Sequence, residues 1–228
     1  MVRLIVYVLY YNDESRQRAE ADFGGLPWCR LLFLPTTRYF EGYAFMELLA
    51  PLRAEWQDAD FVGTLSHKAR SKCAVPADLP DRLEGARRAG IEMVSLYDAG
   101  GAAPVQTGCS FHPNFMNAWR PLLRALGLAP APGDPPLPPV YCNYWVATPA
   151  VMDACVAMHR EARAAIATNG YLDVLMDECA GYPVQPSQEY REATGKNYYV
   201  LCPFLLERLA GVLAARCRHV HLRALPPL

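Results

Sequence analysis

The stretch Val140-Tyr141-Cys142-Asn143-Tyr144-Trp145-Val146-Ala147-Thr148-Pro149 decides the fold prediction. It is an apolar run with one polar residue inside it, Asn143, which is typical of a buried strand. The run stops at Thr148-Pro149, and residues 150 to 167 then have the pattern of a long amphipathic helix. The stretch therefore predicts a strand followed directly by a helix.

Earlier and later segments alternate between the same two patterns. Together they predict an α/β fold, one mixed, mostly parallel sheet with helices on both faces. Residues 128–139 carry six prolines, and we interpret them as a stiff surface connection within a single domain of residues 1–228, with a domain boundary as the alternative. Strands are predicted at Leu4 to Tyr11, Arg30 to Leu34, Asp60 to Leu65 and Ile91 to Tyr97, and helices at Phe40 to Trp56, Leu79 to Ala89, Asn114 to Leu126 and Tyr199 to Arg216.

The composition is that of an ordinary folded protein, with 52% hydrophobic and 20% charged residues. A net charge of −1 argues against a general binder of nucleic acid or of anionic membranes, because phosphate contacts need a basic surplus. The eight cysteines include no Cys-x-x-Cys pair, so we expect free, buried thiols in a reducing compartment. We read the first eleven residues as a strand rather than a signal peptide, and no run is long enough for a membrane span, which predicts a cytoplasmic protein.

Polar residues directly after the predicted strands are candidates for ligand binding, because ligands of such sheets lie beyond the carboxyl ends of the strands. Tyr10 and Tyr11 offer rings on which a base can stack, and Asn12 offers a partner for a pyrimidine edge or a ribose hydroxyl. The alternative is a pair of aromatic residues at the core edge followed by a turn. After the third strand, Lys68 suits the charge of a phosphate.

Acidic residues occur at two further places. Asp98 follows the fourth strand, where a carboxylate can hold Mg²⁺ or Mn²⁺ against substrate phosphates; a simple turn is the alternative. Asp173 and Asp177 are four residues apart and share one face of a short helix, which makes them candidates for the general base of an acceptor hydroxyl. The alternative for this pair is a solvated helix face.

The carboxyl-terminal segment 216–223 contains three arginines and two histidines. We interpret it as a flexible end that folds back over a bound diphosphate and excludes water. Its candidate contacts are Arg218, His219 and His221, and a solvated tail is the alternative.

Taken together, these segments resemble a GT-A glycosyltransferase. The likeness lies in Leu4 to Asn12, Val94 to Ala99, Val140 to Pro149 and Gly170 to Glu178. Asp60 to Lys68, Cys142-Asn143-Tyr144-Trp145 and Tyr198 to Leu209 look more closely like a family of small transferases, which includes the N-terminal glycosyltransferase domain of a chlorella-virus multidomain protein and bacterial polysaccharide-synthesis relatives.

The resemblance implies a GT-A-like fold, with residues 1–100 as the nucleotide-binding half and 140–228 as the acceptor side. It implies a nucleotide-sugar donor such as a UDP-sugar, a glycan or small-molecule acceptor, and a divalent metal, Mn²⁺ or Mg²⁺, at Asp98. It also implies that Asn143 lies beside the donor diphosphate. The Asp-x-Asp motif of that class is represented by Asp98 alone, so a non-catalytic glycan- or nucleotide-binding module on a degenerate transferase fold is the alternative.

Overall fold

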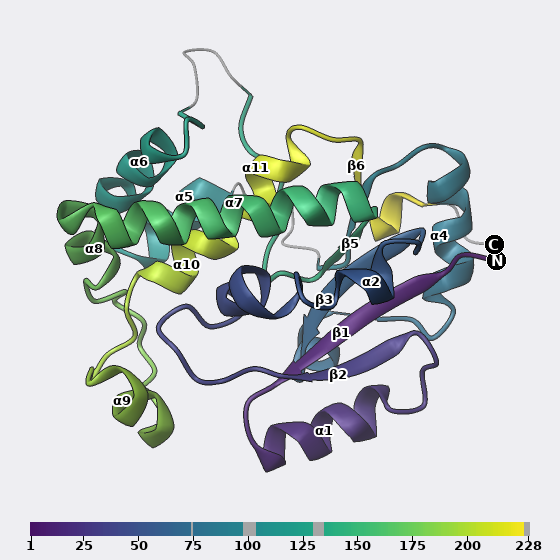
Figure 1. Cartoon of the computed structure of the whole chain (residues 1–228), viewed down its shortest axis with the longest axis horizontal. Coiled ribbons are helices and arrows are strands. Elements are labelled where there is room, and N and C mark those ends of the chain that lie inside the picture. The colour runs from purple at the N-terminus through teal and green to yellow at the C-terminus, as the bar shows by residue number, and fades with distance from the viewer. Residues whose placement is uncertain (74, 98–103, 130–134, 226–228) are drawn as a thin grey trace.

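A six-stranded mixed sheet forms the centre of the molecule in the computed structural model, which describes residues 1–73, 75–97, 104–129 and 135–225 (Figure 1). The strand order is β2-β1-β3-β5-β4-β6. Strand β1 pairs in parallel with β2 and β3, β4 pairs in parallel with β6, and β5 is antiparallel to both of its neighbours. The strands are β1 (Leu4–Tyr10), β2 (Cys29–Phe33), β3 (Phe61–Ser66), β4 (Met93–Ser95), β5 (Trp145–Ala147) and β6 (His219–His221).

Helices cover both faces of this sheet, which confirms the predicted α/β class. One face carries α1 (Asp13–Phe23), α3 (Ala69–Lys72) and α4 (Leu79–Arg88). The other carries η1 (Ala44–Leu48), a π-helical turn, with α2 (Arg53–Trp56), α6 (Phe115–Ala125), α7 (Pro149–Thr168), α8 (Gly170–Met176), α10 (Cys202–Glu207) and α11 (Leu209–Ala214). The remaining elements are α5 (Pro104–Phe111), α9 (Gln188–Thr194) and η2 (Leu222–Ala224).

Alternation along β1 explains the two layers of core. Val6 and Val8 belong to the cluster that contains Phe23 of α1, whereas Ile5 and Tyr7 belong to the cluster that contains the buried residues of α7. Successive side chains of a strand point to opposite faces, so a strand that is apolar at every position is buried on both sides.

No helix within the described ranges is long and apolar enough to cross a membrane.

Gly63 of β3 allows β5 to approach closely. A Cβ atom at this position would lie 2.3 Å from the carbonyl oxygen of Trp145, so the backbone of β5 fills the space that a side chain would need. Stacking of Phe45 on Trp145, with ring centroids 5.7 Å apart, then holds β5 from its other side. The residues that precede β5 are thereby fixed at the carboxyl ends of its antiparallel neighbours.

The predicted strand from Val140 is shorter than expected. β5 begins only at Trp145, because Cys142 and Asn143 have φ angles of 59° and 52°, which break the extended backbone. The helix predicted after it is confirmed, since α7 begins at Pro149 and ends at Thr168. Asn143 therefore lies in a turn before β5 and not inside the strand.

Other predicted elements were longer or less regular than the structure shows. The helix predicted from Phe40 to Trp56 is replaced by turns with η1 and α2, and Phe40 itself has a φ angle of 45°. The predicted last helix divides into α10 and α11. The segment 181–197 contains one short helix, α9.

Candidate functional site

The candidate site lies where the chain connections of the sheet diverge. Strand β2, which follows β1 in the chain, lies on one side of β1, and β3 lies on the other side. The carboxyl ends of β1 and β3 are therefore the topological switch point of the sheet. A pocket of about 470 Å³ lies at this point. Tyr11 and Asn12 after β1 line it together with Ser66, His67 and Lys68 after β3. The structure thus brings together the residues that the strand ends predicted, with the exception of Tyr10.

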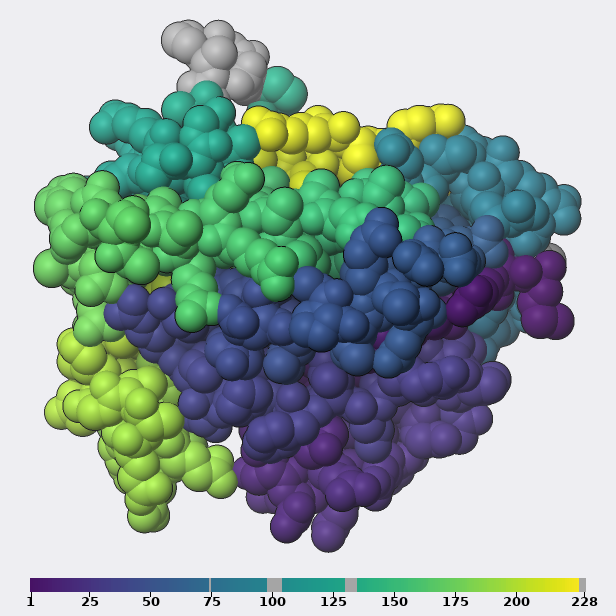
Figure 2. Space-filling model, viewed as in Figure 1, coloured from purple at the N-terminus to yellow at the C-terminus, as the bar shows by residue number. Residues whose placement is uncertain are grey.

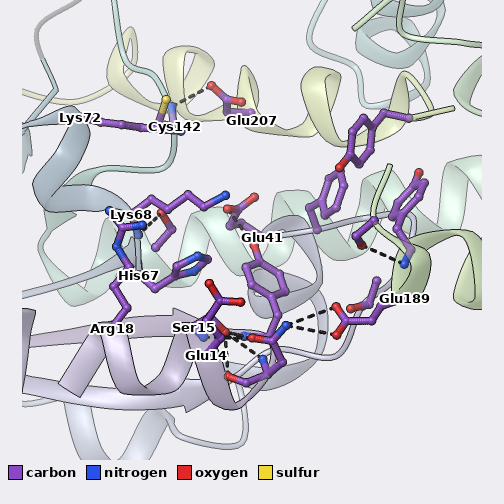
Figure 3. A pocket seen from close by; sticks show the side chains of 18 of the residues that line it. Glu14, Ser15, Arg18, Glu41, His67, Lys68, Lys72, Cys142, Glu189 and Glu207 are labelled. Atoms are coloured by element: carbon purple, nitrogen blue, oxygen red, sulfur yellow. Dashed lines mark hydrogen bonds between the residues drawn. The ribbon is translucent and has the colours of Figure 1, made fainter. Parts of the chain in front are cut away.

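Basic side chains gather on one side of this pocket. The pocket is lined by Arg18 of α1, by Lys68, which directly precedes α3, and by Lys72 of α3 (Figure 3). His67 lies among them but is neutral at pH 7, because burial and then the charges of Lys68 and Arg18 lower its pKa to about 4. Its Nδ1 atom has no hydrogen-bond partner in the described structure. These three cations share the pocket lining with the carboxylates of Glu14, Glu41, Glu189 and Glu207.

Carboxylates oppose these cations. Glu41 accepts a hydrogen bond at Oε1 from the hydroxyl of Tyr11, at 3.0 Å, and burial raises its pKa. Glu207 accepts a hydrogen bond at Oε1 from the backbone N–H of Cys142, at 2.7 Å. In Figure 3, Glu41 is seen between His67 and Lys68 on one side and Glu189 on the other.

Unusual backbone geometry is concentrated at the same pocket. Phe40, Cys142 and Asn143 are the three non-glycine residues with positive φ in the described part of the chain, and the first two line the pocket. A left-handed conformation is costly for a bulky side chain and persists where the surroundings impose it, most often at functional sites. The hydrogen bond from Cys142 to Glu207 is one such constraint.

An aromatic wall, which we define as Phe40, Tyr182, Tyr190, Tyr199 and Phe204, lines the same pocket. The ring of Phe40 stacks on that of Tyr190 with centroids 5.2 Å apart and an angle of 24°. The ring centroid of Tyr199 lies 4.9 Å from that of Tyr190 and 5.9 Å from that of Tyr182. This wall comes mostly from residues 182–204, so the pocket is built from both halves of the chain. Figure 2 shows the hollow between α9 and α1 on the surface.

Two predicted donor-binding residues, Tyr10 and Asn143, lie outside the pocket lining, and a third, Asn12, also caps a helix. The ring of Tyr10 packs against Phe33, at 5.7 Å, and is not part of the pocket lining. Asn12 caps α1, since its Oδ1 accepts from the N–H of Ser15. Asn143 is buried behind the lining; its backbone oxygen accepts from Thr64 Oγ1, at 3.1 Å, and its Oδ1 has no partner in the described structure.

The acidic pair Asp173 and Asp177 lies outside the pocket lining. Arg38 bridges both carboxylates, with Nη2 2.6 Å from Asp173 Oδ1 and Nη1 3.3 Å from Asp177 Oδ1. Lys196 adds a second cation to Asp177, at 2.5 Å. The two residues share a face as predicted, and basic residues neutralise them.

The interpretation of the carboxyl-terminal segment as a flexible end is wrong, because His219–His221 form the edge strand β6. Arg218 lies at the opposite edge of the sheet from the pocket, where its N–H donates to Glu92 Oε2. His219 Nε2 is 3.1 Å from Ser95 Oγ. His221 lies at the pocket edge of the sheet and lines a second cavity of about 350 Å³, which shares Lys72 with the main pocket.

The predicted metal residue, Asp98, lies outside the described residues. Among the residues that the structure does describe, no group of three His, Cys, Asp or Glu side chains is arranged to hold a metal ion. All eight cysteines are free, as predicted, but only Cys155 and Cys202 are buried, and Cys109 and Cys179 are exposed.

Sequence reasoning missed Arg18, Glu41, Lys72 and Glu207. Lys72 had a usable signal, because it follows Lys68 by four residues and a helical turn brings such positions to one side. The other three reach the pocket only through tertiary packing.

A search of protein-family models found no match to this chain, and searches of the curated proteins and of the solved structures found none either.

Proposed function

We propose that this chain is a glycosyltransferase with a GT-A-like fold, which moves a sugar from a UDP-sugar donor to a glycan or small acceptor. The observation that carries the proposal is the group of cations, Arg18, Lys68 and Lys72, in a pocket at the carboxyl ends of β1 and β3. The mixed α/β sheet is compatible with the fold that the sequence resemblance implies.

The charge of the donor explains why such cations matter. A nucleotide-sugar diphosphate is anionic, and the leaving nucleotide gains further negative charge as the sugar departs. Cations already in place stabilise that developing charge without reorganising. We assign Lys68 and Arg18 to the diphosphate. Lys72 lines both this pocket and the second cavity, and His221 lines the second cavity.

The pocket size and lining support a small-molecule ligand. A volume of about 470 Å³ is within the range of sites for ligands of this size. Tyr11 lies at the end of β1 with its hydroxyl engaged by Glu41, so its ring is fixed at the pocket wall. We keep Tyr11 and Asn12 as candidate contacts of the nucleoside and place Tyr10 outside the site.

We keep a divalent metal in the proposal for one reason, which is that Asp98 follows the fourth predicted strand in the sequence. A bound Mg²⁺ or Mn²⁺ would neutralise the leaving diphosphate. The steps assigned below use this chain's own side chains. The proposed bases Asp173 and Asp177 lie outside the pocket lining and form ion pairs with Arg38 and Lys196.

Calorimetric titration with UDP, with and without Mn²⁺, tests the proposal. We expect saturable binding of UDP, followed by release of UDP from at least one of UDP-glucose, UDP-galactose and UDP-N-acetylglucosamine. An absence of binding at millimolar UDP would contradict the donor assignment. Binding without turnover of any donor would favour the non-catalytic module.

A further inference from the structure

We propose that Glu41 is the general base of the transfer, the group that takes the proton from the acceptor hydroxyl; this rests on the proposed function. Glu41 lines the pocket, whereas the acidic residues expected from the sequence, Asp173 and Asp177, do not. The assignment depends on four features of Glu41: its anchor, its burial, its neighbours and the backbone that presents it.

The anchor leaves one oxygen of the carboxylate for substrate. The hydroxyl of Tyr11 donates to Oε1, at 3.0 Å, and Oε2 has no side-chain hydrogen bond from the described residues. A general base needs one oxygen within hydrogen-bond reach of the proton that it removes, and a fixed orientation. The hydrogen bond from Tyr11 fixes the orientation of the carboxylate, and Oε2 is the oxygen that can accept the proton of the substrate.

Burial strengthens Glu41 as a base. Removing a carboxylate from water disfavours its charged form, and the pKa of Glu41 is raised chiefly for this reason. The hydrogen bond from the backbone N–H of Glu41 itself, the hydrogen bond from Tyr11 and the charge of Lys72 lower this pKa, whereas the charge of Glu207 raises it further. A carboxylate whose pKa moves toward the working pH transfers a proton more effectively than an ordinary one.

The other carboxylates of the pocket are less suited to this role. Glu207 is held by the backbone N–H of Cys142, and its Oε2 lies 3.5 Å from Arg208 Nη1. Glu189 accepts from Asn12 with both oxygens. Glu14 is exposed in the first turn of α1. Glu41 alone among these residues is partly buried and has an oxygen that no described side chain occupies.

The backbone presents Glu41 between the cations and the aromatic wall. The residue before it, Phe40, has a φ angle of 45°, and its ring stacks on Tyr190 of that wall. Aromatic faces are suited to the apolar face of a sugar ring, and a few polar groups then fix its hydroxyls. An acceptor sugar on the wall would place a hydroxyl near Glu41, with the donor diphosphate held by Lys68 and Arg18 beyond it.

The chemical step balances with these groups alone. The acceptor oxygen attacks the anomeric carbon of the donor while its proton passes to Glu41 Oε2. The new carbon–oxygen bond forms as the bond between the anomeric carbon and the diphosphate oxygen breaks, and the electron pair leaves on that oxygen, beside Lys68 and Arg18. Water then accepts the proton from Glu41. A single displacement of this kind inverts the anomeric configuration.

The test compares Glu41→Gln with Glu55→Gln. Glu55 is a matched control, because it accepts a hydrogen bond from the hydroxyl of Tyr7, at 3.1 Å, outside the pocket lining. The probes are UDP for binding and the three UDP-sugars for turnover, with water and simple glycosides as acceptors. We expect Glu41→Gln to bind UDP within about twofold of the wild type and to lose at least about 100-fold in kcat, the scale of general-base catalysis. Glu55→Gln should keep the wild-type affinity for UDP and the wild-type kcat.

Two further readouts separate catalysis from structure. The wild-type kcat/KM should fall on the acid side as Glu41 is protonated, and the Gln variant should lose that limb. NMR of the product should show an inverted anomeric centre. Turnover by Glu41→Gln above a tenth of wild type, or retained configuration, would overturn the assignment alone. Wild-type protein that binds no UDP would instead overturn the proposed function together with it.

Discussion

The side-chain amide of Asn12 donates to both carboxylate oxygens of Glu189, at 3.2 and 3.4 Å, although 177 residues separate the two in sequence. This contact joins the amino terminus of α1 to the first turn of α9, and both residues line the pocket. In Figure 1, α9 stands at the margin of the molecule, on the side of α1. This amide–carboxylate contact therefore links the two halves of the chain at the pocket.

Asn12→Asp should loosen α9 while leaving α1 intact. Aspartate caps a helix about as well as asparagine, so the bond to Ser15 N is kept. The new carboxylate loses both donor hydrogens and faces Glu189 with a like charge. We expect amide hydrogen exchange to speed up in residues 188–194 but not in residues 13–23. Unchanged exchange in α9 would show that other contacts hold this helix.

Glu189→Gln is the matched control, because it removes the charge and keeps an oxygen that accepts from Asn12. Its α9 should exchange close to the wild-type rate. Combining the two substitutions should restore much of the protection lost in Asn12→Asp, since the repulsion is then absent.

Lys68→Ala should weaken UDP binding more than Arg70→Ala. Lys68 lines the pocket, whereas Arg70, two residues later, lies over the ring of Phe23 and outside the lining. A hydrogen bond to a charged group contributes about 1.5–3 kcal/mol. We therefore expect the Kd for UDP to rise at least tenfold in Lys68→Ala, about 1.4 kcal/mol, and less than threefold in Arg70→Ala. Equal losses would indicate a general effect of charge and not a site.

His159 should make the fold sensitive to acid. It is buried beneath the sheet, its Nδ1 lies 2.9 Å from the carbonyl oxygen of Cys155, and burial lowers its pKa to about 4. The unfolded state binds its proton near pH 6.5, so the contribution is complete above that pH and is lost as the pH falls toward 4. Between pH 7 and pH 4, the wild type should lose about 3 kcal/mol more unfolding free energy than His159→Gln.

Urea unfolding at a series of pH values measures this difference. The other histidines and the carboxylates are common to both proteins, so the subtraction isolates His159. Parallel curves for the two proteins would contradict the predicted protonation.

Removing residues 218–228 should lower the melting temperature, which is the opposite of what a solvated tail predicts. The deletion removes β6, which pairs with β4, and the buried Leu222. Burial of one leucine side chain contributes about 2 kcal/mol by itself. The variant His221→Ala keeps the strand and should melt close to the wild type while binding UDP less tightly. An unchanged melting temperature in the deletion would contradict the edge-strand assignment.

The elements that sequence patterns predicted best are those fixed by local periodicity. The boundaries of α7 follow from Thr148-Pro149 and the amphipathic pattern after it, and β1 follows from an unbroken apolar run. The start of β5 was not predictable, because the left-handed turn at Cys142 is held by Glu207, which is 65 residues away in sequence.

The same division applies to the site. Tyr11, Asn12 and Lys68 were predicted because they follow strands, and strand ends meet at one edge of a sheet. Glu41 was not predicted, because a segment with helical spacing forms turns and a π-helical turn instead. Its place beside Tyr11 depends on how that segment packs across the sheet, and no pattern within the segment encodes it.

A crystal structure of the wild-type protein with UDP tests the central claim most directly. The account predicts the diphosphate within ion-pair distance of Lys68 and Arg18, in the pocket at the carboxyl ends of β1 and β3, with Glu41 facing the side from which an acceptor would approach. UDP bound elsewhere, for example beside Arg38 and Lys196, or a diphosphate without contact to either Lys68 or Arg18, would contradict it.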